Sequence, residues 1–339
     1  MELQKIKITN YKSLVDLEIK NPNPFTVFAG PNGAGKSNIF EALEFVSYND
    51  RVGSQDVLKM FGGTEKFINF NAPKKDFSIE LKFPNYKSSI VFLDDDSDHT
   101  KHYSYSDLKP SNDLLDNLTI KNLASIQNQL KQFLFYFIRL FINKSELNRI
   151  RYNSNQRILP DASNTASVLK TILLNPNKKE EFLDWVQLFV PGLSNIEVRT
   201  DSIEGNDSLL IFEKDTNKPF TKSLISDGTY NILALLTAVY QADEPQFLCI
   251  EEPENGLNPF VVESLVSFFR QQCEEKGHYI WLNTHSQTLV KHLQPQELIL
   301  VDKKEGATTI KQFPADYNLH GLEMDEAWLS NALGGGVPW

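Results

Sequence analysis

Two glycines, a lysine and a serine near the start of the chain are spaced to hold phosphate. In the stretch "FTVFAGPNGAGKSN", Gly30 is followed after four residues by Gly35, Lys36 and Ser37. Glycines let the backbone curl until several N–H groups point at one anion, and the N-terminus of the next helix adds positive potential. In such a loop Lys36 would contact the outer phosphates and Ser37 would hold Mg²⁺. This P-loop pattern therefore predicts that the protein binds a nucleotide.

The residues on either side of this loop have the pattern that would position it. "FTVFA" is typical of a buried strand, and "SNIFEALEFVSY" has apolar residues at helical spacing. A strand that ends in the loop and a helix that begins there would hold the glycines between them. The local sequence therefore supports the phosphate-binding interpretation.

Two acidic residues follow another apolar run in the second half of the chain. "QFLCIEEPENGLNP" predicts a buried strand from Gln246 to Ile250, ending in Glu251 and Glu252. If this strand lies beside the strand of the P-loop, one carboxylate can hold Mg²⁺ through water, and the next can orient or deprotonate an attacking water. The alternative is a pair of charged residues at a strand end, but the upstream P-loop favours Glu251 as metal ligand and Glu252 as general base.

A histidine ends the next apolar strand pattern. "HYIWLNTHSQTLV" predicts a strand that ends at Thr284, His285 and Ser286. A histidine at a strand end is often a surface or capping residue, but His285 follows the acidic pair by about one βαβ unit, which places it at the same sheet edge. We therefore expect His285 to sense the phosphate.

A second anion-binding helix N-terminus is predicted between the P-loop and the acidic pair. In "SLISDGTYNILALLTAVY", Ser226, Asp227 and Gly228 form a turn that leads into a strongly apolar helix.

The overall composition is that of an acidic globular protein. The chain has 339 residues, a formal net charge of −10 and two cysteines, too few for a disulfide framework. Its start, "MELQKIKITN", alternates like a strand and does not resemble a signal peptide, and the most apolar run, "FLFYFIRLFI", is short and interrupted by Arg139. We therefore expect a cytoplasmic protein that does not contact a membrane.

The middle of the chain predicts a long amphipathic helix followed by a basic segment. Apolar residues at gaps of three and four predict the helix: Leu123, Ile126, Leu130, Phe133, Phe137 and Phe141. The basic residues, set against the single acid Glu146, are Arg139, Lys144, Arg149, Arg151 and Arg157. This excess of positive charge can follow a nucleic-acid backbone, and a solvated or salt-bridged face explains it equally well. Any contact with DNA is expected to be non-specific and to use Arg149, Arg151 and Arg157.

The order of four motifs resembles a known family. "GPNGAGKSN", "LISDGT", "EEPENGLNP" and "NTHS" are similar to those of the ABC-type ATPase heads of the SMC, RecF and OLD group, and most similar to the stand-alone OLD-like ATPases of the AAA family. The opening "KIKITNYKSLVDLEI" and the segment "RILPDASNTASVL" fit the same subgroup. The resemblance implies an α/β fold, namely a P-loop NTPase with an ABC-type head, N-terminal antiparallel strands and a helical insertion.

The resemblance also implies roles for individual residues. Glu251 would be the Walker B acid, Glu252 the catalytic base and His285 the switch histidine, with Ser37 and Glu251 holding Mg²⁺. In such ATPases the signature residues, here Ser226 and Gly228, touch the γ-phosphate of nucleotide held by the other subunit. The residues implied to contact ATP are Gly30, Asn32, Gly33, Gly35, Lys36, Ser37, Asn38, Lys12, Ser13, Ser226, Gly228 and Asn258. Asn258 would lie in the loop that crosses the dimer interface.

The same resemblance predicts the domain organisation and the assembly. Residues 1–105 would form the N-terminal lobe of the head with Walker A, residues 106–190 a helical insertion, and residues 191–339 the C-terminal lobe with the signature, Walker B and the switch histidine. Two chains would close around two ATP molecules and separate on hydrolysis, so the ATPase cycle would act as a switch.

Three functions from different classes fit these motifs. The first is an ATP-hydrolysing subunit that dimerises around ATP and regulates a separately encoded effector, a nuclease or toxin, as in bacterial anti-phage defence. The second is a DNA-repair ATPase of the RecF or SMC type that clamps DNA by itself. The third is the nucleotide-binding subunit of a transporter, against which the "ISDGT" signature and the N-terminal strand pair argue.

Overall fold

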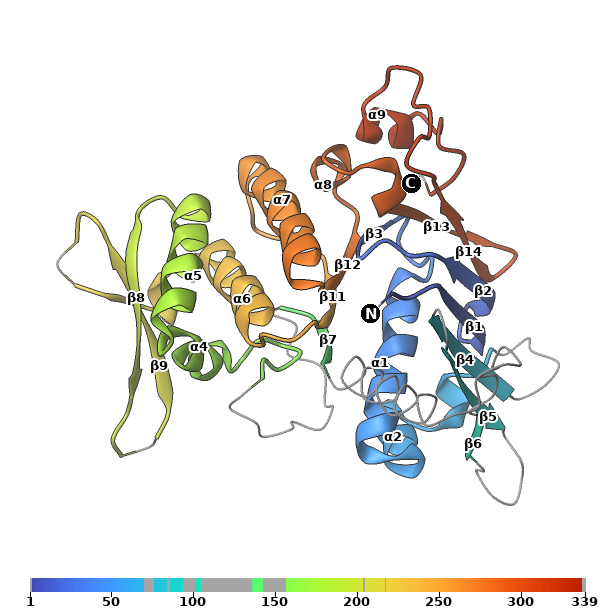
Figure 1. Ribbon diagram of the computed structural model, residues 1–339, viewed down its shortest axis with the longest axis horizontal. Helices are drawn as coiled ribbons and strands as arrows, with labels where there is room; N and C mark the ends of the chain where they lie inside the picture. Colours follow the sequence, from blue (N-terminus) through green and yellow to red (C-terminus); the bar gives the residue numbers. More distant parts are fainter. Residues whose placement is uncertain are drawn as a thin grey trace, which may run out of the picture.

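A parallel sheet forms the centre of the molecule (Figure 1). The computed structural model describes residues 2–69, 76–83, 86–93, 101–104, 136–142, 157–203, 205–216 and 218–336. The strands of the central sheet are β3 (Phe25–Ala29), β7 (Phe137–Leu140), β11 (Phe247–Glu251), β12 (Tyr279–Thr284), β13 (Leu298–Lys304) and β14 (Ala307–Gln312). Their order is β14-β13-β3-β12-β11-β7, and only the pair β13 and β14 is antiparallel. Every residue of β3, β7, β11 and β12 is buried, which is why these strands are mostly apolar and do not alternate between apolar and polar residues.

The sequence suggested that the strand of the acidic pair lies directly beside the P-loop strand, but the two are not neighbours. Instead β12 lies between β3 and β11. In the register of the sheet, Thr284 is paired with Ala29 and Asn283 with Glu251. The consequence is that side chains from the end of β12 separate the P-loop from the predicted metal ligand.

One face of the central sheet is covered by the helix that follows the P-loop. This helix, α1 (Lys36–Val52), is followed by α2 (Ser54–Phe61). Beyond them lies an antiparallel sheet whose strands are β1 (Lys5–Tyr11), β2 (Leu14–Lys20), β4 (Asp76–Phe83), β5 (Tyr86–Leu93) and β6 (Lys101–Ser104), in the order β2-β1-β4-β5-β6. One apolar cluster joins the inner faces of the two sheets across α1, with Ile8, Phe40 and Trp281 fully buried in it.

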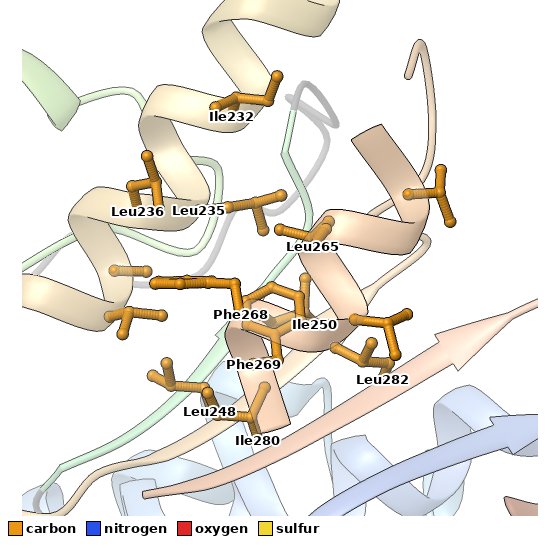
Figure 2. Packing of buried hydrophobic residues seen from close by; sticks show 14 of the residues in the cluster. Ile232, Leu235, Leu236, Leu248, Ile250, Leu265, Phe268, Phe269, Ile280 and Leu282 are labelled. Atoms are coloured by element: carbon orange, nitrogen blue, oxygen red, sulfur yellow. The ribbon is translucent and has the colours of Figure 1, made fainter. Parts of the chain in front are cut away.

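The opposite face of the central sheet is covered by α6 (Asp227–Tyr240) and α7 (Pro259–Lys276). Figure 2 shows Leu235 of α6 and Phe268 of α7 packed over Leu248 and Ile280 of the sheet. Further out, in Figure 1, are α4 (Thr165–Leu173), α5 (Pro176–Phe189) and a sheet of β8 (Leu193–Thr200), β9 (Asp207–Glu213) and β10 (Phe220–Thr221). Short helices α8 (Gln287–Lys291) and α9 (Met324–Leu329) lie near the C-terminal strands. The expected α/β fold with N-terminal antiparallel strands is thereby confirmed.

The prediction of a long helix is wrong at its C-terminal end, which includes Phe137 and Phe141. Residues Phe137–Leu140 form β7, which pairs in parallel with β11 at the edge of the central sheet, and Phe141 donates its backbone N–H to Pro160 O over 2.7 Å. A short apolar run carries no periodicity that separates a buried strand from a helix, and pairing with β11 decides the outcome. The other residues of the predicted stripe, Leu123, Ile126, Leu130 and Phe133, lie outside the described part of the chain.

Candidate functional site

The predicted site residues meet at the carboxyl edge of the central sheet. The P-loop follows β3, Glu252 follows β11 and His285 follows β12, and these three strands run in the same direction. Ligands of open α/β sheets bind at this edge because the loops that follow parallel strands gather there.

Lys36 is folded into the P-loop. Its ammonium group donates to Gly30 O over 2.7 Å and to Pro31 O over 3.0 Å, and the residue is only 4% exposed. Burial lowers the pKa of Lys36 to about 8, against the opposing pull of nearby carboxylates such as Glu251. The Nδ1 atom of His285 lies 3.5 Å from Lys36 Nζ. The predicted phosphate sensor and the P-loop lysine are therefore side by side.

The histidine stays neutral in this arrangement. Burial lowers the pKa of His285, and the positive charge of Lys36 lowers it further. A neutral imidazole can accept a hydrogen bond at one nitrogen and donate from the other, which suits a group that reports on phosphate beside the Lys36 ammonium.

Gly30 and Gly35 of the P-loop are required by close contacts with β13 and β14. A Cβ on Gly30 would lie 2.0 Å from Val301 O of β13, and one on Gly35 would lie 2.1 Å from Thr308 Oγ1 of β14. Gly35 also has φ 104°, a conformation that residues with a side chain rarely adopt. The Thr308 hydroxyl donates to Ala34 O over 2.7 Å. The hairpin of β13 and β14 thus packs against the P-loop and supports its conformation.

The predicted metal ligands are already in contact. Ser37 Oγ donates to Glu251 Oε2 over 2.9 Å, and Asn283 Nδ2 donates to Ser37 Oγ over 3.1 Å and also to Glu251 Oε2. One hydroxyl and one carboxylate, both hard oxygen donors, fit Mg²⁺, which takes few protein ligands when phosphates and waters supply the rest. Among the described residues there is no group of three or more His, Cys, Asp or Glu placed to bind a metal by itself. The pair therefore fits a metal that arrives with nucleotide.

A buried arginine holds the other oxygen of Glu251. Arg139, on β7, donates from Nε and Nη2 to Glu251 Oε1 over 2.9 and 2.6 Å, and from Nη1 to Glu44 Oε2 over 3.2 Å. Burial lowers the pKa of Arg139, but the charges of Glu251 and Glu44 more than compensate, so the pKa is raised overall. Arg139 is thus a buried partner of two acids, so of the two alternatives for the basic segment the salt-bridged one holds for this residue.

Glu252, the predicted base, has a constrained backbone. Its φ is 49°, in the left-handed region that is uncommon for residues other than glycine. Its N–H donates to Asn283 O over 2.8 Å, and its Oε2 accepts from Asn255 Nδ2 over 2.8 Å. The Glu252 carboxylate is therefore held by Asn255, three residues further along the same turn.

A third acid of the same loop is held at the end of β12. Thr284 Oγ1 donates to Glu254 Oε1, and Ser286 N donates to Thr284 Oγ1 over 2.9 Å. Burial is the main reason that the pKa of Glu254 is raised to about 7, and the charge of Glu252 raises it as well, against the hydrogen bond from Thr284. Glu254 and Thr284 thus connect the loop after β11 to the segment that carries His285.

The predicted signature residues begin α6. Ser226 is the exposed N-cap, and its Oγ accepts from Thr229 N over 3.1 Å. Gly228 is buried, and a Cβ there would lie 2.4 Å from Gly256 O. From the next turn of α6, Asn231 Nδ2 donates to Asn255 O over 2.8 Å. The start of α6 is therefore in direct contact with the loop that carries Glu252.

The remaining predicted contacts lie around the P-loop and at the start of α7. Ser13 Oγ accepts from Asn38 Nδ2 over 2.8 Å and lies 2.6 Å from Thr308 Oγ1. Lys12 forms an ion pair with Glu41 of α1. Asn258 caps α7 by accepting from Val261 N over 3.0 Å. Asn32 and Gly33 are exposed at the tip of the P-loop.

The predicted nucleic-acid contacts are described only in part. Arg157 lies over the Tyr136 ring, 4.3 Å from its centroid, and Arg149 and Arg151 lie outside the described residues. Within the described ranges no helix has both the length and the apolar content needed to cross a membrane.

Three site residues were not found from the sequence: Arg139, Asn283 and Glu254. Each had a visible signal, because Arg139 is a single polar residue in an apolar strand, Asn283 is a polar residue near the end of another, and Glu254 is a third acid in "EEPE". What the sequence lacks is the pairing of strands that brings the first two to Glu251.

A P-loop after β3, an acidic pair after β11 and a histidine after β12 define a P-loop NTPase with an ABC-type head. The chain belongs to the family described as "AAA domain, putative AbiEii toxin, Type IV TA system", which matches residues 25–291. It is therefore an ATPase of the SMC and RecF type, which binds and hydrolyses ATP.

Individual relatives agree with this assignment. An "ATP/GTP phosphatase" of Helicobacter pylori is 21% identical over 92% of this chain and 91% of that protein. The "DNA replication and repair protein RecF" of Corynebacterium jeikeium is 35% identical, over 24% of this chain and 19% of that protein. Among solved structures, an SmcHead bound to the C-winged helix domain of ScpA is similar with a TM-score of 0.63 at 14% identity, over 93% of this chain and 98% of that one. At such identity the structural likeness shows the fold alone.

Proposed function

We propose that this ATPase is a switch that closes as a homodimer around ATP and regulates a separately encoded effector, a nuclease or toxin, in anti-phage defence. In this proposal the protein is an OLD-like member of the ABC-type ATPases. Ser37 and Glu251 hold Mg²⁺, Glu252 is the general base, His285 senses the γ-phosphate, and Ser226 and Gly228 of one chain face the nucleotide of the other.

The observation that carries the proposal is the exposed start of α6. Gly228 and Tyr230–Tyr240 are buried, while Ser226 and Asp227 at the N-terminal end are exposed. The N–H groups and the positive end of the helix dipole at such a terminus attract an anion. An exposed terminus on an otherwise buried helix is suited to receive the phosphate of a nucleotide bound to a second chain.

The effector is inferred from the family. Its description names a toxin and a toxin–antitoxin system, and the similar SMC heads were solved with ScpA as a separate partner. A P-loop cycle supplies two states that differ in bound phosphate, and a partner that prefers one state is controlled by hydrolysis.

The first test is the mass of Glu252→Gln measured by light scattering after gel filtration, with and without Mg-ATP. A dimer that forms only with ATP supports the switch. An unchanged monomer contradicts a homodimeric site, and then a partner must supply the second half. For the effector, co-purification of a nuclease or toxin that depends on ATP is the expected outcome, and a partner retained equally without nucleotide contradicts regulation by the ATPase cycle.

The RecF and Smc similarities favour a second candidate, an ATPase that clamps DNA by itself. This candidate predicts that duplex DNA stimulates hydrolysis and that the stimulation falls as salt rises, because phosphate contacts release counterions. Neutralising Arg149 and Arg151 removes the stimulation if these residues contact DNA. A hydrolysis rate that DNA does not change eliminates the candidate.

A further inference from the structure

The contact between Arg139 and Glu251 joins a strand outside the P-loop motifs to the metal site. Arg139 is 5% exposed and Glu251 is 8% exposed, so the ion pair is shielded from solvent. Two nitrogens of the guanidinium donate to the same atom, Glu251 Oε1, and the third donates to Glu44 of α1. One arginine therefore links β7, β11 and the helix that follows the P-loop.

The two oxygens of Glu251 have separate partners. Oε1 is occupied by Arg139, while Oε2 accepts from Ser37 and Asn283. A carboxylate is free to turn about its last bond unless its oxygens are fixed, and the planar fork of arginine fixes one oxygen in a set direction. With Oε1 held, Oε2 is the oxygen that faces the hydroxyl of Ser37.

Charge supports the same arrangement. Glu44 and Glu251 both approach Arg139, and like charges this close in a buried region repel strongly unless a cation lies between them. Without the guanidinium, Glu251 would turn away from Glu44 and its Oε2 would leave Ser37.

The position of Arg139 is itself fixed. It is paired with Cys249 in the parallel register of β7 and β11, and its guanidinium lies 4.2 Å from the centroid of the Phe141 ring. Arg51 Nη2 of α1 donates to Phe137 O over 2.8 Å, which ties the start of β7 to the same helix. Arg139 thus acts from a rigid element.

We infer that Arg139 is a positioning residue for the Mg²⁺ of this ATPase: it holds Glu251 so that Oε2 faces the metal position beside Ser37. The inference rests on the proposed roles of Ser37 and Glu251 as metal ligands. It gives β7, which carries none of the P-loop motifs, a defined part in nucleotide chemistry.

The test measures metal binding directly. Wild type, Arg139→Gln and Arg139→Lys are titrated with Mn²⁺ in the presence of ADP, and free Mn²⁺ is followed by electron paramagnetic resonance. Loss of a residue that orients a ligand typically lowers metal affinity by about 10- to 100-fold. We expect a loss in that range for Arg139→Gln and a smaller one for Arg139→Lys, which keeps the charge without the fork. ADP affinity in EDTA should stay within about twofold of wild type, because no metal is involved.

Arg270, a half-buried arginine paired with a buried glutamate, offers a control for the loss of an arginine–glutamate ion pair. Arg270 of α7 donates to both oxygens of Glu297 over 2.6 and 2.9 Å, and Glu297 is 3% exposed. Arg270→Gln should lower the melting temperature and leave Mn²⁺ affinity unchanged. Equal losses of Mn²⁺ affinity in Arg270→Gln and Arg139→Gln would overturn the inference, because the effect would then be general loosening of the fold. Wild-type Mn²⁺ affinity in Arg139→Gln would also overturn it.

Two further variants separate the possible failures. Glu44→Gln leaves the contact between Arg139 and Glu251 in place, so it should keep Mn²⁺ affinity within about twofold. Arg139→Lys becomes the decisive variant if Arg139→Gln does not fold. A loss in Glu44→Gln as large as in Arg139→Lys would show that Arg139 does not act through Glu251. Ser37→Ala tests the ligand assignment alone: if it retains full Mn²⁺ affinity, the underlying assignment is wrong and the inference falls with it.

Discussion

The side chain of Asn255 holds Glu252 by a hydrogen bond of 2.8 Å from Nδ2 to Oε2. The backbone oxygen of the same asparagine accepts from Asn231 of α6 over 2.8 Å. Two hydrogen bonds therefore connect the helix that begins with the predicted signature to the predicted base. A displacement of α6 by a second chain would be transmitted to Glu252 through Asn255.

Glu252→Gln should slow ATP hydrolysis by about 10²- to 10⁴-fold, the range for a lost general base, and leave ATP binding intact. Glutamine keeps an oxygen that accepts from Asn255, so the loop should retain its conformation. Phosphate release in single-turnover experiments and the affinity for a fluorescent ATP analogue measure the two quantities. Hydrolysis near the wild-type rate would remove Glu252 from the chemistry.

Ser226→Asp and Ser226→Asn form a pair that differs in charge alone. Both side chains cap a helix about as well as serine, so α6 should begin normally in each. If Ser226 faces the γ-phosphate of the other chain, the added negative charge of Asp abolishes ATP-induced dimers in the Glu252→Gln background, whereas Asn preserves them. Light scattering at low and moderate salt compares the two. Dimers of equal stability would show that no anion approaches this helix terminus.

Gly228→Ala should destabilise the chain by about 1–3 kcal/mol, the usual cost of forcing extra volume into a packed region. The added carbon would lie 2.4 Å from the carbonyl oxygen of Gly256, and a backbone atom cannot turn aside as a side chain can. Gly192→Ala is the control, because its new carbon meets no atom within 4 Å. Urea unfolding of both proteins gives the difference. Equal stabilities would mean that the start of α6 and the loop of Gly256 separate at little cost in free energy. The effect of a substitution at Gly228 on dimerisation would then report on the contact with the partner chain alone.

Glu254→Gln should change how stability depends on pH. The pKa of Glu254 rises from 4.5 to about 7 on folding, so the folded state retains a proton that the unfolded state releases. The stability that this proton provides is present at pH values below 4.5 and is lost as pH rises to 7. Glutamine is neutral at every pH, so the free energy of unfolding of the variant rises relative to that of wild type across this interval, by at most about 3 kcal/mol. Above the interval the difference between the two proteins is constant. Denaturant unfolding at several pH values measures this difference, and one that does not vary with pH would mean that Glu254 is ionised in the folded protein.

The nucleotide site was predictable to the extent that its residues are local in sequence. The P-loop with Lys36 and Ser37 is a continuous motif whose backbone geometry depends on its own glycines, and the acidic pair follows a strand that composition marks clearly. These features require no knowledge of which strands are neighbours. The order of strands in the sheet does require that knowledge. The sequence suggested that the acidic strand lies next to β3, but β12 occupies that position.

Arg139 shows why the remainder was not predictable. In the run "FLFYFIRLFI" it reads as an interruption, and by charge it belongs with the basic residues that follow. Its true environment is set by the pairing of β7 with β11 and by Glu44 on α1, both distant in sequence. Gly228 is similar, since its need to be glycine arises from the carbonyl of Gly256 and not from its own backbone angles.

The support of the P-loop by Thr308 has a consequence for the order in which the protein is made. The loop leaves the ribosome well before both neighbours of its strand, β12 and β13, and before the threonine that binds Ala34. Until β12 emerges, β3 has no partner on either side, and until residue 308 emerges the loop lacks the hydrogen bond to Ala34. A nascent chain therefore cannot assemble its nucleotide site before β12, β13 and Thr308 have emerged, and the competence to bind ATP arises together with the central sheet.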